Sequence, residues 1–443
     1  MKTVTFCVRD FRDYLTYRDA SDRATQVTAP VRALLDSDYV QNFLYRKLHF
    51  YAARDEALNA PIAGETGIDG LRLDFNFGLR LEVPAGNFRV KIGEVDGETF
   101  LDEKISDVRI VSFEKYFIRW RVEIFLDDEK IFAHALNLEN QPVLIAVCLN
   151  GLGDVISILP AAREFRKLHR CNLSILIPKY LREFAANLYP EFNFVDEMNF
   201  ENYATYFPTM CIGDYPGVPV DIRNMPMELV AGKILGLSGH VPKPTFKPTA
   251  PPVTNVPYVC IAVQTSNARK CWLHPNGWDI VVDYLKNLGY RIFCIDKNAQ
   301  EISDGMTICK PEGAENFTGD FPIMHRANML YHAEFFIGLG SGLSWVANAV
   351  NCPVVMICGF SADWFEFDTP YRVANRNVCN GCFNDVRVNF MGNICPYHGG
   401  TRRELECQKK ISPRQVLDAI ERLIVDRNLT PPALKKLVRG DNV

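Results

Sequence analysis

The sequence predicts an α/β protein with two Rossmann-like halves that face each other across a cleft, preceded by a β-rich region. Two observations carry this prediction. Apolar strand-like runs alternate with helical patterns from Val143 to about Phe246, and the same alternation starts again at Tyr258. Between them, the proline-rich stretch 241–257 is typical of a stiff linker. Two such halves joined by a linker imply a cleft between them.

The region before the first half, residues 1–140, has a different pattern. Apolar spacing over 31–57 predicts a helix. It is followed by runs in which apolar and polar residues alternate, such as FRVKIGEV and YFIRWRVEIFL. Because such alternation indicates a sheet with one face in water, we expect an antiparallel sheet or a small β-barrel here.

The expected boundaries of the two halves are 141–250 and 251–443, with a cysteine-rich finger at 375–410. One uncharged stretch of the second half, Phe335 to Ala362, is long enough to suggest a membrane span. Its glycines and a proline divide it into strand FFIGLG, helix SGLSWVANAV and strand VVMICGF. We therefore expect a buried β-loop-α-β unit there.

The composition gives further limits. The chain has 443 residues, a net charge of −4 and an isoelectric point near 6.1. This balance gives no support for a protein that coats nucleic acid or an anionic membrane. Charged residues in MKTVTFCVRDFRDYL interrupt what would be the apolar region of a signal peptide. We expect a cytoplasmic protein with no membrane span and no nucleic-acid partner.

The turn Gly151-Leu152-Gly153-Asp154 joins the apolar run VLIAVCL to a helical pattern that extends to Leu168. In an open α/β sheet, ligands bind outside the carboxyl ends of the strands, and glycines let a substrate approach the backbone closely. Asp154 is therefore a candidate general base. The spacing alone gives equal support to the alternative that Asp154 only caps the helix.

The second half contains a candidate phosphate site. Gly340-Ser341-Gly342 lies between strand FFIGLG and a helix, where free backbone N–H groups could hold an anion. Thr265 and Ser266 end the run YVCIAVQTS, and Lys270 follows in the next loop, where its charge could neutralise a leaving diphosphate. A loop kept glycine-rich for packing and a merely solvated lysine are the alternatives. No Walker motif is present, which argues against a P-loop hydrolase.

Four of the 14 cysteines stand apart from the rest. Cys379, Cys382, Cys395 and Cys407 lie in a segment rich in Asn, Gly and Arg, and the opening C-x-x-C has the spacing of a metal knuckle. We expect them to hold one Zn²⁺ or Fe ion, with His398 able to replace one ligand. The alternative is four unrelated reduced cysteines, and the expected cytoplasm disfavours disulfides. The sequence does not choose between iron and zinc.

These motifs together resemble glycosyltransferases of the GT-B fold, specifically heptosyltransferases, and among them the bacterial autotransporter heptosyltransferases. YFIRWRVEIF and LDFNFGLRLEVPAG resemble the amino-terminal β domain of that family, NGLGD its catalytic turn, and GLGSGLSW its nucleotide loop. Lipopolysaccharide heptosyltransferases usually have aspartate before this loop and histidine soon after it, where the chain has Gly340 and Trp345. That departure disfavours a lipid-core acceptor.

The resemblance implies transfer of heptose from ADP-heptose to serine hydroxyls of an autotransporter passenger protein. The first half would then be the acceptor side and the second the nucleotide-sugar side. We expect an inverting reaction with Asp154 as base, with Lys270 and the Ser341 loop stabilising the departing diphosphate, and with no catalytic divalent metal. The resemblance further implies iron in the finger and a large homo-oligomer, a dodecamer.

Three rival functions remain open at this point. A lipopolysaccharide-core heptosyltransferase would share the fold and the donor but would transfer sugar to a lipid. A nucleotide-sugar epimerase with the same two-lobed fold would consume the donor without any acceptor. A non-enzymatic scaffold, built around the finger and the β domain, would bind the passenger and transfer nothing.

Overall fold

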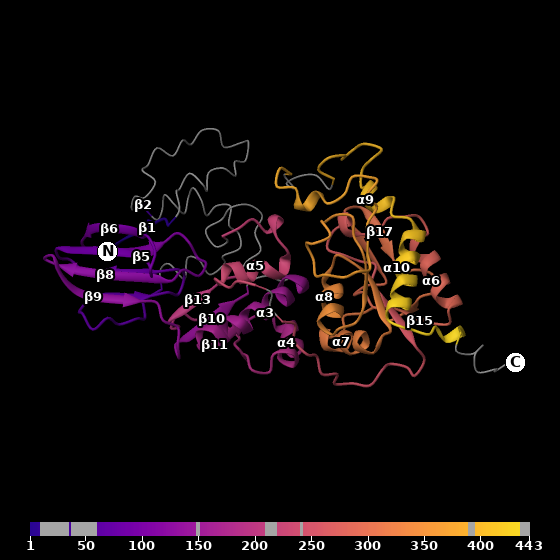
Figure 1. Ribbon diagram of the computed structural model, residues 1–443, viewed down its shortest axis with the longest axis horizontal. Coiled ribbons are helices and arrows are strands. Elements are labelled where there is room, and N and C mark those ends of the chain that lie inside the picture. Colours follow the sequence, from indigo (N-terminus) through magenta and orange to yellow (C-terminus); the bar gives the residue numbers. More distant parts are fainter. Residues whose placement is uncertain are drawn as a thin grey trace.

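The computed structural model describes residues 1–8, 35–36, 60–147, 151–208, 219–239, 242–388 and 395–434 (Figure 1). In Figure 1 the β-rich region lies at one end, the first Rossmann-like half in the middle and the second half at the other end. None of the helices in the described ranges is both long and apolar enough to cross a membrane.

The amino-terminal region consists of two sheets. The five-stranded sheet has the order β2-β1-β7-β4-β3, and the four-stranded sheet has the order β6-β5-β8-β9. Their bounds are β1 Lys2–Phe6, β2 Leu35–Asp36, β3 Arg72–Asp74, β4 Arg80–Val83, β5 Phe88–Glu94, β6 Thr99–Ile105, β7 Val108–Ser112, β8 Trp120–Leu126 and β9 Glu129–Ala135. Inward side chains alternate with exposed or half-exposed ones along β5 and β8, as the sequence pattern predicts.

Two features of this region differ from expectation. The strands form two separate sheets, and β1 pairs with β7 in parallel, so the arrangement is not purely antiparallel. Of the helix predicted over 31–57, the structure describes only Leu35–Asp36, and this pair forms strand β2 against β1. The prediction of one continuous helix is wrong at that point because strand pairing overrides the local apolar spacing. The rest of that range lies outside the described residues.

The first Rossmann-like half is a parallel four-stranded sheet of order β12-β11-β10-β13. Its elements are β10 Pro142–Ala146, α3 Leu152–His169, β11 Asn172–Leu176, η3 Lys179–Leu181, α4 Arg182–Leu188, β12 Asn193–Phe194, β13 Ala204–Tyr206, η4 Ile222–Asn224 and α5 Met227–Ile234. The central strand β10 is buried over Val143–Ala146, which explains its continuous apolar run. Helix α3 starts at the carboxyl end of this strand.

Residues 242–257 form neither helix nor strand, in agreement with the predicted linker. The second half that follows is a parallel six-stranded sheet of order β18-β15-β14-β19-β20-β21. Numbered in order along the chain within this half, that is the 3-2-1-4-5-6 arrangement of a dinucleotide-binding sheet. A small antiparallel hairpin, β16 Gln300–Ser303 with β17 Met306–Cys309, lies outside it.

Helices cover this sheet on both faces. The strands and helices of the second half are β14 Tyr258–Ile261, η5 Ala268–Lys270, α6 Gly277–Asn287, β15 Arg291–Cys294, β18 Glu315–Asn316, α7 Ile323–His332, β19 Phe335–Leu339, α8 Gly342–Ala349, β20 Val354–Ile357, β21 Arg372–Val373, η6 Cys382–Asn384, α9 Glu406–Lys409 and α10 Pro413–Asp426. Helices α7 and α8 lie on the face toward the first half, and α6 and α10 lie on the far face (Figure 1).

Two apolar cores correspond to these faces. Alternate side chains of β14 belong to different cores: Val259 and Ile261 pack toward α6 and α10, whereas Cys260 packs toward α7 and α8. The core that contains Cys260 is continuous with the cores of the first half and of the β-rich region. The three parts are therefore joined by one apolar core, which holds the facing ends of the two Rossmann-like sheets in place.

Candidate active site

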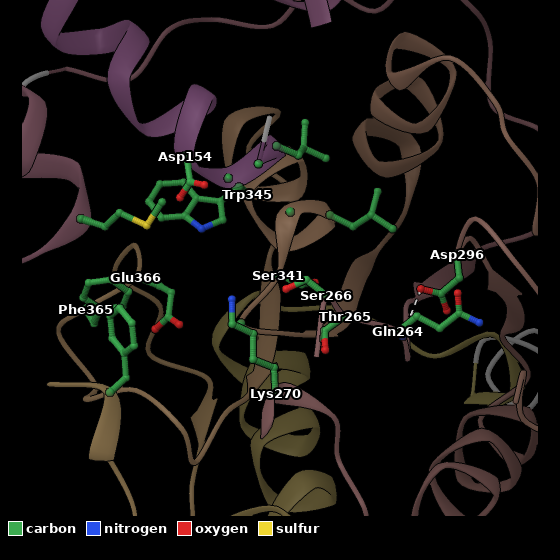
Figure 2. Close-up of a pocket in the computed structure, with 18 of the residues that line it drawn as sticks. Asp154, Gln264, Thr265, Ser266, Lys270, Asp296, Ser341, Trp345, Phe365 and Glu366 are labelled. Atoms are coloured by element: carbon green, nitrogen blue, oxygen red, sulfur yellow. Dashed lines mark hydrogen bonds between the residues drawn. The ribbon is translucent and has the colours of Figure 1, made fainter. Parts of the chain in front are cut away.

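A cleft of about 630 Å³ separates the two Rossmann-like halves. All seven residues predicted from the sequence to form the catalytic and nucleotide site line this one cleft (Figure 2). They are Asp154, Thr265, Ser266, Lys270, Gly340, Ser341 and Gly342. The cleft is formed where the carboxyl end of β10 faces the carboxyl ends of the neighbouring strands β14 and β19, as expected of ligand sites in open α/β sheets.

Asp154 is the third residue of α3, and Gly151 is the residue that caps this helix. The interpretation of Asp154 as a mere cap is therefore not supported by its position. No residue that the structure describes donates a hydrogen bond to its carboxylate, whereas its backbone carbonyl accepts one from Ser157 Oγ at 2.8 Å. A Cβ atom at Gly151 would lie 2.1 Å from Asp154 Oδ2, so this glycine leaves room for the carboxylate.

The environment of Asp154 favours a base. Burial raises the pKa of the Asp154 carboxyl above its ordinary value, and the charge of Lys270 acts in the opposite direction. A carboxylate with a raised pKa binds a proton more tightly than an exposed one, which is what general-base catalysis near neutral pH requires. Among the described residues, no hydrogen-bond donor to this carboxylate would compete with a substrate hydroxyl.

The turns at the start of α3 and α8 touch each other across the cleft. A Cβ atom at Gly153 would lie 2.7 Å from Cδ1 of Trp345, and a Cβ atom at Gly342 would lie 2.7 Å from Cβ of Leu152. Each helix thus places a glycine against a side chain of the other. Trp345 is itself held by an edge-to-face contact with Phe367, at 5.1 Å between ring centroids. The observed spacing of the two halves at this point requires both glycines.

The start of α8 is suited to an anion. Ser341 is its extended N-cap residue, and the first turn of the helix contains no acidic side chain. The hydroxyl of Ser344 is used inside the turn, where it donates to the carbonyl of Leu339 at 2.5 Å. The first N–H groups of a helix have no partner within it, and together with the helix dipole they favour negative charge. These groups lie beside Ser341, which lines the cleft.

Lys270 reaches the cleft from η5, the short 3₁₀ helix that follows β14. The loop before it is shaped by Thr265, whose hydroxyl donates to the carbonyl of Asn267 at 2.6 Å. Gln408 supports the same loop by donating to the carbonyl of Arg269 at 2.6 Å. The hydroxyl hydrogen of Thr265 is thus committed to the fold, so only its oxygen remains to accept from a ligand.

The sequence did not lead us to the residues at one end of the cleft, Asp296 and Gln264. Asp296, just after β15, accepts backbone N–H groups of Val263 at 2.8 Å and Gln264 at 3.2 Å, and burial raises its pKa to about 6. Gln264 donates to the carbonyl of Asn298 at 2.7 Å, while its buried Oε1 has no partner among the described residues. The aspartate that ends the run RIFCID, after an apolar strand like the one before Asp154, is the signal that could have found it.

Sequence reasoning also missed a carboxylate at the opposite end. Glu366 lies in the loop after β20, lines the cleft, and is 7% exposed. Arg372 and Ser361 both donate to it. Trp345 and Phe365 line the cleft nearby (Figure 2). Nothing in the local sequence DWFEFD marks Glu366, because its burial arises from contacts with Gly340, just after β19, and with Arg372 of β21.

The four finger cysteines come together outside the lining of the cleft. Cys379, Cys382, Cys395 and Cys407 line one small cavity with His398. The loop is fixed at Gly381, which adopts a left-handed φ of 66° and donates its N–H to the carbonyl of Gly359 at 2.9 Å. Sulfur donors in this number fit a thiophilic metal such as iron or zinc. Within the described ranges, however, no three His, Cys, Asp or Glu side chains are arranged to hold a metal ion.

Comparisons with protein families match two parts of the chain. Residues 67–128 match the family described as "Glycosyltransferase TibC, N-terminal domain". Residues 235–386 match "Glycosyltransferase family 9 (heptosyltransferase)". The first match covers most strands of the β-rich region, and the second covers the Lys270 loop and the Gly340-Ser341-Gly342 turn.

Similar proteins cover about four fifths of the chain. The autotransporter heptosyltransferase BAHTCr of Citrobacter rodentium is 38% identical over 372 residues, which span 82% of this chain and 91% of that protein. The crystal structure of TibC, an iron-containing dodecameric glycosyltransferase of enterotoxigenic Escherichia coli, superimposes with a TM-score of 0.79 at 36% identity, covering 84% of this chain and 99% of that one. TibC has also been solved in complex with ADP-D-beta-D-heptose.

One relative shows that this similarity does not by itself guarantee catalysis. BimC of Burkholderia thailandensis, described as an inactive autotransporter heptosyltransferase, is 32% identical over 363 residues, which span 79% of this chain and 85% of that protein. The chemistry of the cleft therefore has to be judged from its own residues.

Proposed function

This chain belongs to the autotransporter heptosyltransferase family, and on that premise we propose that it transfers heptose from ADP-heptose to serine hydroxyls of an autotransporter passenger protein, with inversion at the sugar. The observation that carries this proposal is the cleft in which a partly buried Asp154, whose carboxylate accepts no hydrogen bond from the described residues, faces Lys270 and the start of α8. A base on one wall and a diphosphate site on the other are the two parts that such a transfer needs.

The second half would bind the donor. Its diphosphate would lie against the first N–H groups of α8 and the Lys270 ammonium, with Thr265, Ser266 and Ser341 alongside. The complex of TibC with ADP-D-beta-D-heptose supports this choice of donor. Asp296 and Gln264 lie beyond Lys270 in the same cleft, where the nucleoside part of the donor would extend (Figure 2).

In the proposed reaction, Asp154 accepts the proton of the serine hydroxyl while the serine oxygen forms a bond to the anomeric carbon. The bond between this carbon and the diphosphate oxygen breaks, and ADP leaves with the bonding electrons. Asp154 belongs to α3 of the first half, across the cleft from Ser341, so attack and departure occur on opposite faces of the sugar and inversion follows. Lys270 and the helix N–H groups stabilise the leaving charge, so the proposal assigns no role to a divalent metal.

We further propose that Cys379, Cys382, Cys395 and Cys407 hold one metal ion, iron by analogy with the iron-containing TibC, with zinc as the alternative. The metal would supply folding energy to a polar loop and take no part in the transfer. A dodecamer like that of TibC and a cytoplasmic location belong to the same proposal. Free thiols throughout the described residues support a reducing compartment.

Mass spectrometry tests the main proposal directly. Purified protein is incubated with ADP-heptose and, in parallel, with a passenger fragment, with a lipopolysaccharide-core acceptor, or with no acceptor. A heptose mass added to serines of the fragment supports the proposal. Transfer to the lipid alone, consumption of donor without acceptor, or binding of the fragment without any transfer would each replace it with one of the rival functions.

The finger is tested with a double variant, Cys379→Ser with Cys382→Ser. Elemental analysis should show loss of iron or zinc, and light scattering should show smaller assemblies than the wild type. Cys309→Ser is the matched control, because Cys309 is an exposed cysteine at the end of β17, outside the finger. A wild type without bound metal would contradict the metal site, and a metal-free variant of unchanged size would contradict its role in assembly.

A further inference from the structure

Glu366 is a buried carboxylate that neither the base nor the phosphate site uses. It lines the cleft at 7% exposure from the loop after β20. Arg372 Nη2 donates to its Oε2 at 2.7 Å, the Ser361 hydroxyl donates to its Oε1 at 2.7 Å, and the Cys358 thiol makes a weaker contact with Oε1 at 3.9 Å. These donors hold the carboxylate in place. Oε2 keeps a further lone pair, so Glu366 can still accept a hydrogen bond from a ligand in the cleft.

Gly340 is what leaves this carboxylate open to the cleft. A Cβ atom at position 340 would lie 2.7 Å from Glu366 Oε1 and 3.1 Å from Cys358 Sγ. The backbone of Gly340 is not in the left-handed region, so glycine is required here for space rather than for conformation. Any side chain at this position would displace Glu366 or cover it.

The position of Glu366 along the cleft indicates which part of a donor it meets. In Figure 2, Lys270 and Ser341 lie in the middle, Asp296 and Gln264 lie on one side of them, and Glu366 lies on the other, the side of Asp154. A diphosphate held by Lys270 therefore has the nucleoside toward Asp296 and the sugar toward Glu366 and Asp154.

The chemistry of a carboxylate agrees with this order. A fixed negative charge repels a diphosphate but accepts strong hydrogen bonds from sugar hydroxyls. The Arg372 guanidinium balances the charge of Glu366, so Glu366 is the weaker candidate for removing the proton of the acceptor, and that role stays with Asp154.

We propose that Glu366, held by Arg372 and Ser361 and uncovered by Gly340, binds hydroxyl groups of the donor sugar and thereby selects the sugar. This inference rests on the proposed function, since it assigns a sugar-recognition residue to that same cleft. It gives Glu366 a different role from the diphosphate and nucleoside sites, which would bind ADP whether or not heptose is attached.

Calorimetry with two ligands, ADP and ADP-heptose, tests it. Glu366→Gln keeps the size of the side chain and removes its charge. It should weaken the binding of ADP-heptose by about 10- to 100-fold, the size expected for hydrogen bonds to a charged group. ADP lacks the heptose that would contact Glu366, so it should bind as tightly as it does to the wild type.

A second variant and a control guard against a folding defect. Gly340→Ala retains both Arg372 and Glu366 but displaces or covers the carboxylate, and it should produce the same selective loss of ADP-heptose affinity. Asp363→Asn is the matched control: Asp363 lies in the same loop, 3.4 Å from Arg372 Nε, is 45% exposed in its side chain and is not among the residues that line the cleft. It should leave both affinities unchanged.

The outcomes separate this inference from the proposed function. Equal weakening of both ligands in Glu366→Gln or Gly340→Ala means that Glu366 only supports the fold, and unchanged affinity for both means that it touches no ligand. Either result overturns the inference while a wild type that transfers heptose keeps the proposed function. A wild type that neither binds ADP-heptose more tightly than ADP nor transfers heptose overturns the proposed function itself. Should Glu366→Gln fail to fold, Gly340→Ala decides alone.

Discussion

The turns that begin α3 and α8 have the same construction and opposite electrostatics. Each follows a buried parallel strand, β10 or β19, each contains glycines, and the two touch across the cleft. The first turn of α3 carries Asp154, whereas the first turn of α8 carries no acidic residue. The start of a helix attracts negative charge. In α3 the Asp154 carboxylate supplies that charge, whereas in α8 the N–H groups of the first turn remain available to a negatively charged ligand. Under the proposed function, the first turn supplies the base and the second supplies the anion site.

The largest expected effect comes from removing the charge that distinguishes α3. Asp154→Asn should lower kcat by ~10²- to 10⁴-fold, the contribution typical of a general base. The melting temperature should stay the same or rise slightly at neutral pH. The reason is that burial raises the pKa of Asp154, so its ionised form costs stability above that pKa. Rates and thermal unfolding of the purified variant check both expectations.

The matched control is Asp279→Asn. Asp279 is the third residue of α6, the same helix position as Asp154 in α3, but it accepts a backbone N–H from Glu312 and is not among the residues that line the cleft. Its loss should leave kcat near the wild-type value. If Asp154→Asn stays as active as this control, then α3 carries no base and the contrast between the two turns fails.

The next effect tests the contact between the turns. Gly153→Ala would place a Cβ atom 2.7 Å from Trp345, and Gly342→Ala would place one 2.7 Å from Leu152. Either change should force the halves apart and lower kcat by up to about 10²-fold, because a displacement near 1 Å at reacting groups can cost that much. The two variants should resemble each other, since they act on one contact from opposite sides.

Gly232→Ala is the control for these two variants. Gly232 is also a helical glycine of the first half, but the nearest atom to an added Cβ lies 3.9 Å away, an ordinary contact. Alanine favours helix by about 1 kcal/mol over glycine, so this variant should be as active as the wild type and slightly more stable. Full activity in Gly153→Ala or Gly342→Ala would show that the halves do not need this spacing.

A smaller effect is expected at Lys270, which belongs to η5 and lines the same cleft as the start of α8. Lys270→Met keeps most of the side-chain length and removes the charge, so it should weaken the binding of ADP-heptose and of ADP by about 10-fold or more. Lys297→Met is the comparison variant, because Lys297 also lines the cleft but pairs with Asp320 at 3.3 Å. It should have the smaller effect in calorimetry. Equal effects would mean that Lys270 contributes only general positive charge.

The sequence predicted the two turns because their signals are local. A buried apolar run, a glycine turn and a helical pattern lie together in each of them, and the structure places Asp154, Lys270 and Ser341 around one cleft as that pattern implies. Asp296 was missed because its backbone partner Val263 is distant in sequence. Glu366 was missed because its burial depends on how its own loop folds against Arg372 and Gly340, which no sequence pattern specifies. The parallel pairing of β1 with β7 was missed for the same reason, since no local pattern specifies which strands meet.

The smallest effect, and the most direct test of how the two walls of the cleft interact, is a shift in pH dependence. Asp154 acts as a base only when it is deprotonated, so kcat/KM should fall as pH drops through its pKa. Burial raises this pKa above the ordinary value of 3.8, and the charge of Lys270 lowers it. In Lys270→Met the lowering influence is gone, so the acidic limb of the kcat/KM profile should move to higher pH, whereas Lys297→Met should leave it in place. The measurement uses saturating acceptor at constant ionic strength. A limb that stays put or moves to lower pH in Lys270→Met would mean that the cation of the second half does not act on the carboxylate of the first.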